Sequence, residues 1–250
     1  MDTADKGKAV GRHDGKVVFV EGAVPGDVVD VLVQKRKKGH LIGKSIKLHK
    51  ASEDRRPAFC SYFGVCGGCK WQHLDYQAQL KYKEQTVVNA LQRIGKVEVG
   101  EFLPILAAKK TQYYRNKLEF SFSNKRWLTE EEVQTGDTFD QRNALGFHRP
   151  GAFDKIVDVN HCYLQPDPSN AIRNAVRDFA LKEGYTFFDI RQQEGLLRQL
   201  YVRITEIGEV MVMVSFFEDD EPKREALLTY LAKTFHAYLM TLTLMAKLIA

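Results

Sequence analysis

The four cysteines of this chain fall into one pattern, which constrains the fold more than any other feature of the sequence. Cys60, Cys66 and Cys69 lie within FCSYFGVCGGCKW, and Cys162 follows far downstream in HCYLQ. Three thiolates close together and one remote can hold an iron–sulfur cluster or a structural zinc ion. Because these are all the cysteines present, we expect none to be left as a catalytic nucleophile.

The residues around the cysteines favour a cluster. Gly67 and Gly68 let the backbone turn tightly and direct N–H groups toward sulfur. Aromatic side chains that can exclude water flank the loop at Phe59, Tyr62, Phe63 and Trp71. We therefore predict that Cys60, Cys66, Cys69 and Cys162 bind a 4Fe-4S cluster.

Two alternatives to the cluster stay open at this point. Zinc is possible because His73 and His161 lie near the cysteines in sequence and could replace one of them as ligands. Disulfides would need an exported protein, and the opening residues MDTADKGKAV contain no recognisable signal peptide. This composition indicates a protein of the reducing cytoplasm, without a membrane span.

Positive charge is concentrated near the N-terminus. The whole chain has a net charge of +5, and the segment 34–50, QKRKKGHLIGKSIKLHK, has basic residues but no acidic one. Such a segment in a small domain is typical of polyanion binding. We predict RNA contacts at Lys35, Arg36, Lys37 and Lys38. The alternative is an edge strand whose lysines only prevent aggregation.

Hydrophobic periodicity predicts an α+β fold with two main domains. Residues 8–50 show several short strands separated by turn signals such as Asp14-Gly15, which favours a small OB-like β-barrel. A helix is expected over 74–94, and the remainder alternates strands with helices near 168–184 and from 221 onward. We expect a barrel at 1–57, a cluster-bearing antiparallel α+β domain at 58–236 and an atypical tail at 237–250.

The second domain also contains basic residues in strand-like segments. Arg115 and Lys117 begin one strand and Arg149 ends another, and cations on an open sheet can bind phosphates. We predict that these three residues contact RNA. Phe120, Phe122 and Tyr201 are expected to belong to the core.

Motifs for nucleotide binding and hydrolysis are missing from the sequence. It contains no G-x-x-x-x-G-K-[ST] loop, no H-E-x-x-H helix and no G-x-G-x-x-G after a strand. We therefore predict no catalytic residue and no cofactor-binding residue other than the metal ligands.

Several segments together resemble the RNA uracil-5-methyltransferase family, specifically its iron–sulfur 23S rRNA branch. GKAVGRHDGKVVFVEGAVPGDVV is similar to the TRAM domain of that family, and CSYFGVCGGCKWQH resembles its cluster loop. YRNKLEFSFS, LGFHRPGAFDKIVDVNHCYLQ and GLLRQLYVRIT are similar to its central domain. The resemblance implies a TRAM barrel followed by a central domain, 23S rRNA as partner and 5-methyluridine as product.

The family chain is nearly twice as long, which leads to three further expectations. The Rossmann-like methyltransferase domain is expected to be missing, so S-adenosylmethionine would bind only to the complete family protein. The chain would then be an RNA-binding and cluster-holding fragment, monomeric and inactive alone. The alternatives are a stand-alone RNA-binding module with a structural cluster, and an electron carrier.

Overall fold

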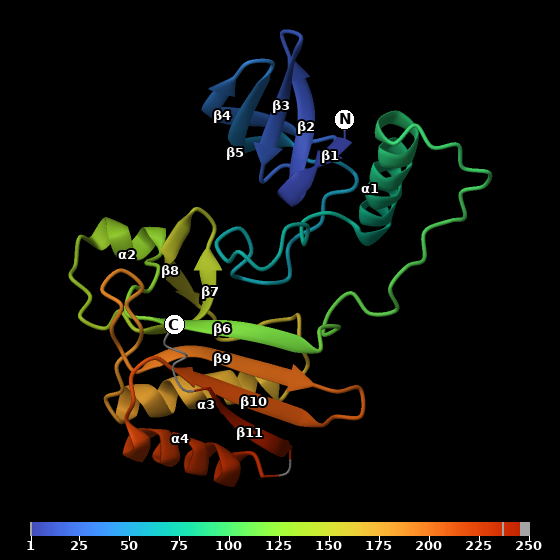
Figure 1. Cartoon of the computed structure of the whole chain (residues 1–250). Coiled ribbons are helices and arrows are strands. Elements are labelled where there is room, and N and C mark those ends of the chain that lie inside the picture. The colour runs from blue at the N-terminus through green and yellow to red at the C-terminus, as the bar shows by residue number, and fades with distance from the viewer. Residues whose placement is uncertain (1, 237, 246–250) are drawn as a thin grey trace. The chain divides into compact units, whose positions relative to one another are not determined.

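The computed structural model describes residues 2–236 and 238–245 and divides into two compact units (Figure 1). The N-terminal unit comprises Met1–Gly64 with Cys69–Lys109, and the C-terminal unit comprises Val65–Gly68 with Lys110–Ala250. In the part of the chain described, no helix has the length and apolar composition needed to cross a bilayer.

The N-terminal unit is built on a five-stranded sheet. Its strands are β1 (Asp2–Ala4), β2 (Lys8–His13), β3 (Lys16–Glu21), β4 (Val28–Lys37) and β5 (His40–Lys50), with a short 3-10 turn η1 (Asp5–Gly7) after the first. The order is β1-β2-β3-β5-β4, and all neighbours are antiparallel except β3 and β5. The small core contains Ala9, Val18, Val20 and Ala23. The prediction of short strands without an α-helix over 8–50 is confirmed.

The hairpin expected at Asp14-Gly15 is also confirmed. His13 pairs with Lys16, so the two residues between them form the whole turn. Both have positive φ, 47° at Asp14 and 73° at Gly15, which is the backbone that tight hairpins favour and that aspartate and glycine tolerate best.

A buried ion pair fixes the polar segment that follows β5. The Asp27 side chain is fully buried, and it accepts hydrogen bonds from Arg55 Nη2 at 2.6 Å and from the Ser52 backbone N–H at 2.9 Å. Arg55 also donates to the Gly22 carbonyl at 3.1 Å. The segment 52–57 is therefore held against the strands through these bonds.

Helix α1 (Tyr76–Asn89) continues into a π-helical turn, η2 (Ala90–Ile94), and ends at Gly95 as predicted. The Asp75 carboxylate accepts the N–H of Gln77 and caps the start of the helix. Leu74 and Ala78 pack against Val24, so the start of the helix is attached to the turn between β3 and β4.

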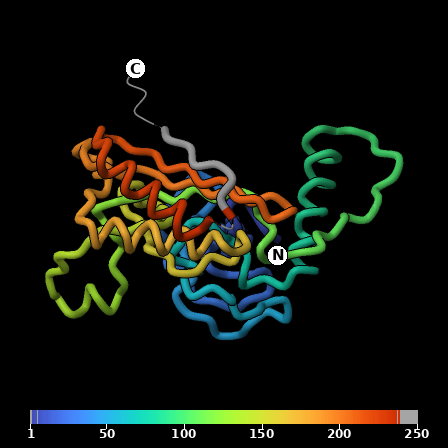
Figure 2. The backbone as a smooth tube through the Cα atoms, turned by 90° about the horizontal axis from the view of Figure 1, so that it is seen from below, coloured from blue at the N-terminus to red at the C-terminus, as the bar shows by residue number. Residues whose placement is uncertain are grey.

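The C-terminal unit contains a six-stranded sheet. Its strands are β6 (Lys117–Ser123), β7 (Ala144–Arg149), β8 (Ala152–Asp158), β9 (Leu197–Ile204), β10 (Val210–Phe216) and β11 (Leu239–Met245), in the order β11-β10-β9-β6-β7-β8. Its helices are α2 (Glu130–Thr135), α3 (Ser169–Lys182) and α4 (Glu221–Thr234). Figures 1 and 2 show α3 and α4 together on one face of this sheet.

The prediction of an antiparallel sheet is wrong at one pair of strands. β10 and β11 run parallel, because α4 carries the chain back along the sheet before β11 begins. Seven residues of the predicted atypical tail, Leu239–Met245, form this strand. Residues 237 and 246–250 of that tail lie outside the described part of the chain.

Strict alternation along the strands places the core of the C-terminal unit under the helices. Leu118, Phe120 and Phe122 of β6 are each at most 3% exposed, and Leu200 and Val202 of β9 are fully buried. The expectation that Phe120 and Phe122 belong to the core is confirmed.

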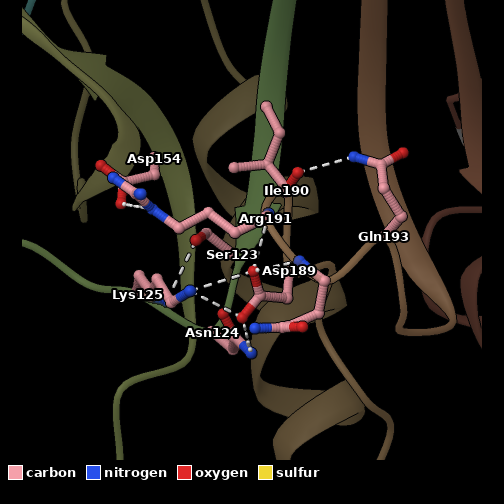
Figure 3. Close-up of polar contacts among 9 residues, drawn as sticks. Ser123, Asn124, Lys125, Asp154, Asp189, Ile190, Arg191 and Gln193 are labelled. Atoms are coloured by element: carbon pink, nitrogen blue, oxygen red, sulfur yellow. Dashed lines mark hydrogen bonds and ion pairs between the residues drawn. The ribbon is translucent and has the colours of Figure 1, made fainter.

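A polar network holds one end of this sheet (Figure 3). The Asp189 carboxylate accepts from Lys125 Nζ at 2.8 Å, from Asn124 Nδ2 at 3.1 Å and from the Arg191 backbone N–H at 2.8 Å. The hydrogen bond from Lys125 is the main reason that the pKa of Asp189 lies well below its usual value. The network ties the turn before β9 to the end of β6.

Candidate metal-binding and RNA-contact residues

The four predicted metal ligands are divided between the two units. Cys60 and Cys69 belong to the N-terminal unit, and Cys66 and Cys162 belong to the C-terminal unit. None of the four forms a disulfide, and Cys162 is the most deeply buried. Among the described residues, no group of three or more His, Cys, Asp or Glu is gathered closely enough to hold a metal ion. Since each unit contributes only two cysteines, the complete ligand set remains a prediction.

The thiol of Cys60 in the N-terminal unit has a raised pKa. Burial raises the pKa of the Cys60 thiol, and the neighbouring Cys69 raises it further. The Cys60 backbone N–H donates to Gln72 Oε1 at 3.2 Å, and the Cys60 carbonyl accepts from the Phe63 N–H at 3.0 Å. A raised pKa keeps Cys60 protonated at neutral pH until a bound cation stabilises its thiolate.

The diglycine of the loop is fixed within the C-terminal unit. The Gly67 N–H donates to the His148 carbonyl at 3.2 Å, which attaches residues 65–68 to the end of β7. The Gly68 N–H donates to the Cys66 sulfur at 3.4 Å. An N–H group directed at a thiolate sulfur is typical of iron–sulfur sites, so this part of the loop fits a cluster ligand.

Cys162 is held by an amide of α3. Its backbone N–H donates to Asn170 Oδ1 at 2.7 Å, and Asn170 Nδ2 donates back to the Cys162 carbonyl at 3.2 Å. Both partners are buried. These two hydrogen bonds fix the backbone of Cys162 and therefore the position of its Cβ. No sequence pattern had indicated this role for Asn170.

The two histidines considered as zinc ligands both make aromatic contacts. The ring of His73 packs on Phe63 with centroids 4.9 Å apart, and burial followed by the nearby Arg55 lowers its pKa. His161 Nε2 hydrogen-bonds the Tyr113 hydroxyl at 3.0 Å, and its ring contacts Tyr163 with centroids 4.5 Å apart. These contacts give both rings a packing role.

The basic run of the N-terminal unit lies at the end of β4 and in the turn to β5. All four side chains are exposed: Lys35, Arg36, Lys37 and Lys38. Within the described part of the chain, none of them forms an ion pair with a carboxylate, so their charges face solvent. The run is therefore accessible to phosphates, and its contact with RNA remains a prediction.

The three basic residues predicted in the C-terminal unit have different surroundings. The side chain of Arg115 is exposed, whereas Lys117 Nζ pairs with Glu119 Oε1 at 2.6 Å. The Arg149 guanidinium is half-buried and lies over the Trp127 ring, 5.0 Å from its centroid. Arg149 is therefore partly used in packing, while Arg115 and Lys117 remain accessible.

Comparison with known proteins agrees with the N-terminal part of this description. Residues 2–46 match the TRAM domain family. The match covers the strands and the exposed basic run together.

Proteins similar to the whole chain are named as RNA methyltransferases of uncharacterized activity. One from Bacteroides thetaiotaomicron is 48% identical over 235 residues, which cover 93% of this chain and 52% of that protein. One from Porphyromonas gingivalis is 50% identical over 239 residues, covering 94% and 51% respectively. The chain thus spans about half the length of the curated relatives it matches.

A solved structure shares the fold. It is that of the Pyrococcus abyssi tRNA (uracil-54, C5)-methyltransferase in complex with S-adenosyl-L-homocysteine, with a TM-score of 0.62 and 21% identity. The likeness covers the whole of this chain and 51% of that one.

These matches correct the predicted fold class. The expectation that the Rossmann-like methyltransferase domain is missing is not supported, because 93–94% of this chain aligns with about half of each relative. It also superposes along its full length on half of a methyltransferase structure. The described units are therefore a stretch shared with about half of each of these proteins.

Proposed function

We propose that this chain is the RNA-binding and cluster-holding portion of an S-adenosylmethionine-dependent RNA (uracil-5-)-methyltransferase. Its product would be 5-methyluridine in 23S rRNA. The observation that carries the proposal is the combination of a TRAM match over residues 2–46 with 48–50% identity to proteins named as RNA methyltransferases. The uracil C-5 specificity follows the name of the structural relative and the motifs of the sequence.

The four cysteines would hold one 4Fe-4S cluster with a structural role. The proposed ligands are Cys60, Cys66, Cys69 and Cys162. Support comes from the four-thiolate donor set and from the N–H of Gly68 directed at the Cys66 sulfur. Methyl transfer to a carbon atom moves no net electrons, so the cluster would orient the RNA-binding loops without changing its redox state.

RNA would be held by cations of both units. The exposed run Lys35–Lys38 would supply phosphate contacts on the TRAM strands, and Arg115, Lys117 and the half-buried Arg149 would supply further contacts on the C-terminal unit. We divide the chain functionally into residues 1–57, which approach the RNA, residues 58–236, which hold the cluster and orient the target, and the remainder, 237–250. The protein would work as a monomer in the cytoplasm, where rRNA is available and thiols stay reduced.

Deletion of the gene in the source organism tests this function. Purified 23S rRNA and purified tRNA from the deletion strain would be digested, and 5-methyluridine would be quantified by mass spectrometry. We expect one rRNA fragment to lose its 5-methyluridine, and reintroduction of the gene to restore it.

The outcomes separate the alternatives. Loss of 5-methyluridine from tRNA alone would contradict 23S rRNA as the substrate but would support uracil C-5 methylation as the reaction. Unchanged 5-methyluridine in both RNA classes would contradict the methyltransferase proposal and favour a stand-alone RNA-binding module.

A further inference from the structure

One face of the six-stranded sheet in the C-terminal unit is covered by neither α3 nor α4. Leu118, Phe120 and Phe122 of β6 are buried, and the Arg173 guanidinium of α3 lies 5.7 Å from the Phe120 ring centroid, so by alternation these three side chains share the face that α3 covers. By alternation, Lys117, Glu119 and the hydroxyl of Ser121 lie on the opposite face. Within the C-terminal unit, Figure 1 shows the two long helices, α3 and α4, together on one face of the sheet, so neither of them covers the other face.

On this second face, called the open face below, side chains of β6, β9 and β10 lie side by side. Strand register places Lys117 beside Arg203 and Arg203 beside Met211, while Glu119 lies beside Tyr201 and Tyr201 beside Met213. These six residues line a shallow hollow of about 140 Å³: Lys117, Glu119, Tyr201, Arg203, Met211 and Met213. Tyr201 is thus half-buried on the open face, contrary to the expectation that it belongs to the core.

The polar groups of this hollow are arranged around the tyrosine. The Tyr201 hydroxyl donates to Gln199 Oε1 on the same strand. Burial, followed by the nearby Glu119, raises the pKa of Tyr201, so the ring stays neutral. Arg203 is exposed and forms no ion pair within the described residues, whereas Lys117 is paired with Glu119.

We propose that this face is a platform for unpaired RNA nucleotides, on which one base stacks on Tyr201 while Arg203 and Lys117 bind the adjacent phosphates. An aromatic ring flanked by cations on an open sheet is the arrangement by which sheets bind single strands. The hollow contains two cations, Lys117 and Arg203, and one carboxylate, Glu119, so its net positive charge favours binding of a polyanion. The thioether side chains of Met211 and Met213 extend the apolar surface on which a second base can stack. The inference rests on the proposed function and adds the residues that would hold RNA next to the target.

The test is a set of RNA titrations with the whole chain. The probe is a fluorescently labelled single-stranded 12-nucleotide uridine-rich RNA, and its dissociation constant is measured by anisotropy at several salt concentrations. Tyr201→Leu should weaken binding about 5- to 100-fold through the loss of stacking, whereas Tyr201→Phe should stay within about twofold of the parent. The same RNA annealed to its complement should bind equally to parent and Tyr201→Leu.

Charge variants test the phosphate contacts. Arg203→Gln should reduce the slope of log affinity against log salt by about 0.7, the value for one contact with a single strand. Glu119→Gln should strengthen binding, because it removes the carboxylate that pairs with Lys117. A purely structural role of Glu119 would not produce tighter binding.

Matched controls lie on the helix side of the same unit. Tyr230 of α4 stacks on Phe179 with centroids 4.5 Å apart, and Lys182 ends α3. Tyr230→Leu can lower the melting temperature, but neither it nor Lys182→Gln should change RNA affinity. Thermal melting of every variant separates loss of fold from loss of binding.

Photocrosslinking locates the contact directly. With 5-iodouridine in the probe, we expect the crosslink in the tryptic peptide that covers residues 199–203, which ends at Arg203. Parent-like affinity and salt slope in both Tyr201→Leu and Arg203→Gln would overturn the platform while leaving RNA binding by the chain intact. Failure of the parent chain to bind any RNA would overturn the proposed function as well.

Discussion

Gly67 and His148 are bound so closely that only glycine fits at position 67. The Gly67 N–H donates to the His148 carbonyl at 3.2 Å, and a Cβ added to Gly67 would meet that same oxygen at 2.7 Å. Real Cβ atoms do not approach a backbone oxygen so closely, so alanine would push residues 65–68 away from β7. The neighbouring Cys66 would move with them.

We therefore expect Gly67→Ala to lower both stability and metal content. The displaced loop should cost about 1–3 kcal/mol of the free energy of unfolding. Metal per chain, measured by plasma emission after anaerobic purification, should fall. Gly100→Ala is the matched control, since nothing lies within 4 Å of a Cβ at that position. Equal loss in the two variants would refute the steric argument.

Asn170 should control metal loading through Cys162. Asn170→Ala removes both hydrogen bonds to the Cys162 backbone, and positioning residues of this kind typically change metal affinity 10- to 100-fold. Competition with a chelator measures that affinity. Asn174→Ala, one turn further along α3, removes a bond to the Asn160 carbonyl instead and serves as the control. Unaltered affinity in Asn170→Ala would show that Cys162 needs no positioning.

Cys162→Ser should destabilise metal-loaded protein more than metal-free protein. If Cys162 is a ligand, its loss weakens metal binding, and metal binding contributes to folding. A decrease of several degrees in melting temperature is expected, because about 2–4 °C correspond to 1 kcal/mol in a chain of this length. The same decrease with and without metal would indicate that Cys162 is only a buried thiol.

Acid should release the segment held by Asp27. Burial alone would raise the pKa of this carboxyl, but hydrogen bonds from Arg55 and from the N–H groups of Val24 and Ser52 outweigh it and lower the pKa below 3.8. Because the pKa of Asp27 is lower in the folded than in the unfolded protein, ionised Asp27 stabilises the fold fully above pH 3.8. This stabilisation is lost as the pH falls through the pKa of Asp27 in the folded protein.

Asp27→Asn should accordingly remove this part of the acid dependence and cost about 1–3 kcal/mol at neutral pH. Urea unfolding between pH 3 and pH 7 measures both effects. Asp30→Asn is the control, because Asp30 is 54% exposed and pairs with His49 rather than with a buried arginine. A parent-like pH profile in Asp27→Asn would contradict the assignment.

The exposed basic run should dominate the salt dependence of RNA binding. Replacing Lys35, Arg36, Lys37 and Lys38 with glutamine should reduce the salt slope by about 0.7–0.9 for each phosphate that the variant no longer binds. Lys182→Gln with Lys233→Gln on the helix side provides a control for net charge. An unchanged slope in the fourfold variant would mean that the run only protects an edge strand.

Local sequence patterns predicted the individual strands and helices better than the order and direction of the strands in the sheet. Alternation indicated β6, β9 and β10, and the Asp14-Gly15 turn followed from backbone preferences alone. The parallel strand β11 was not predicted, because its place beside β10 depends on the path of α4 rather than on its own residues. The length of the chain also led to the expectation of a missing domain, which the comparisons do not support.

Side-chain roles depended on neighbours distant in sequence. Tyr201 was assigned to the core because its type is usually buried, and only the register with Glu119 and Met213 shows that it lies on the open face. Asn170 carried no signal, since its partner Cys162 lies in a preceding loop. Four cysteines in one chain, in contrast, restrict the possible chemistry through their residue type and spacing alone.

The central claim is that these four cysteines act together as the ligands of one cluster. Iron and acid-labile sulfide should be quantified in protein prepared without oxygen, together with its absorption spectrum. We predict about four irons and four sulfides per chain and a broad absorption near 400 nm. A colourless anaerobic protein that contains one zinc ion and no iron would contradict the claim.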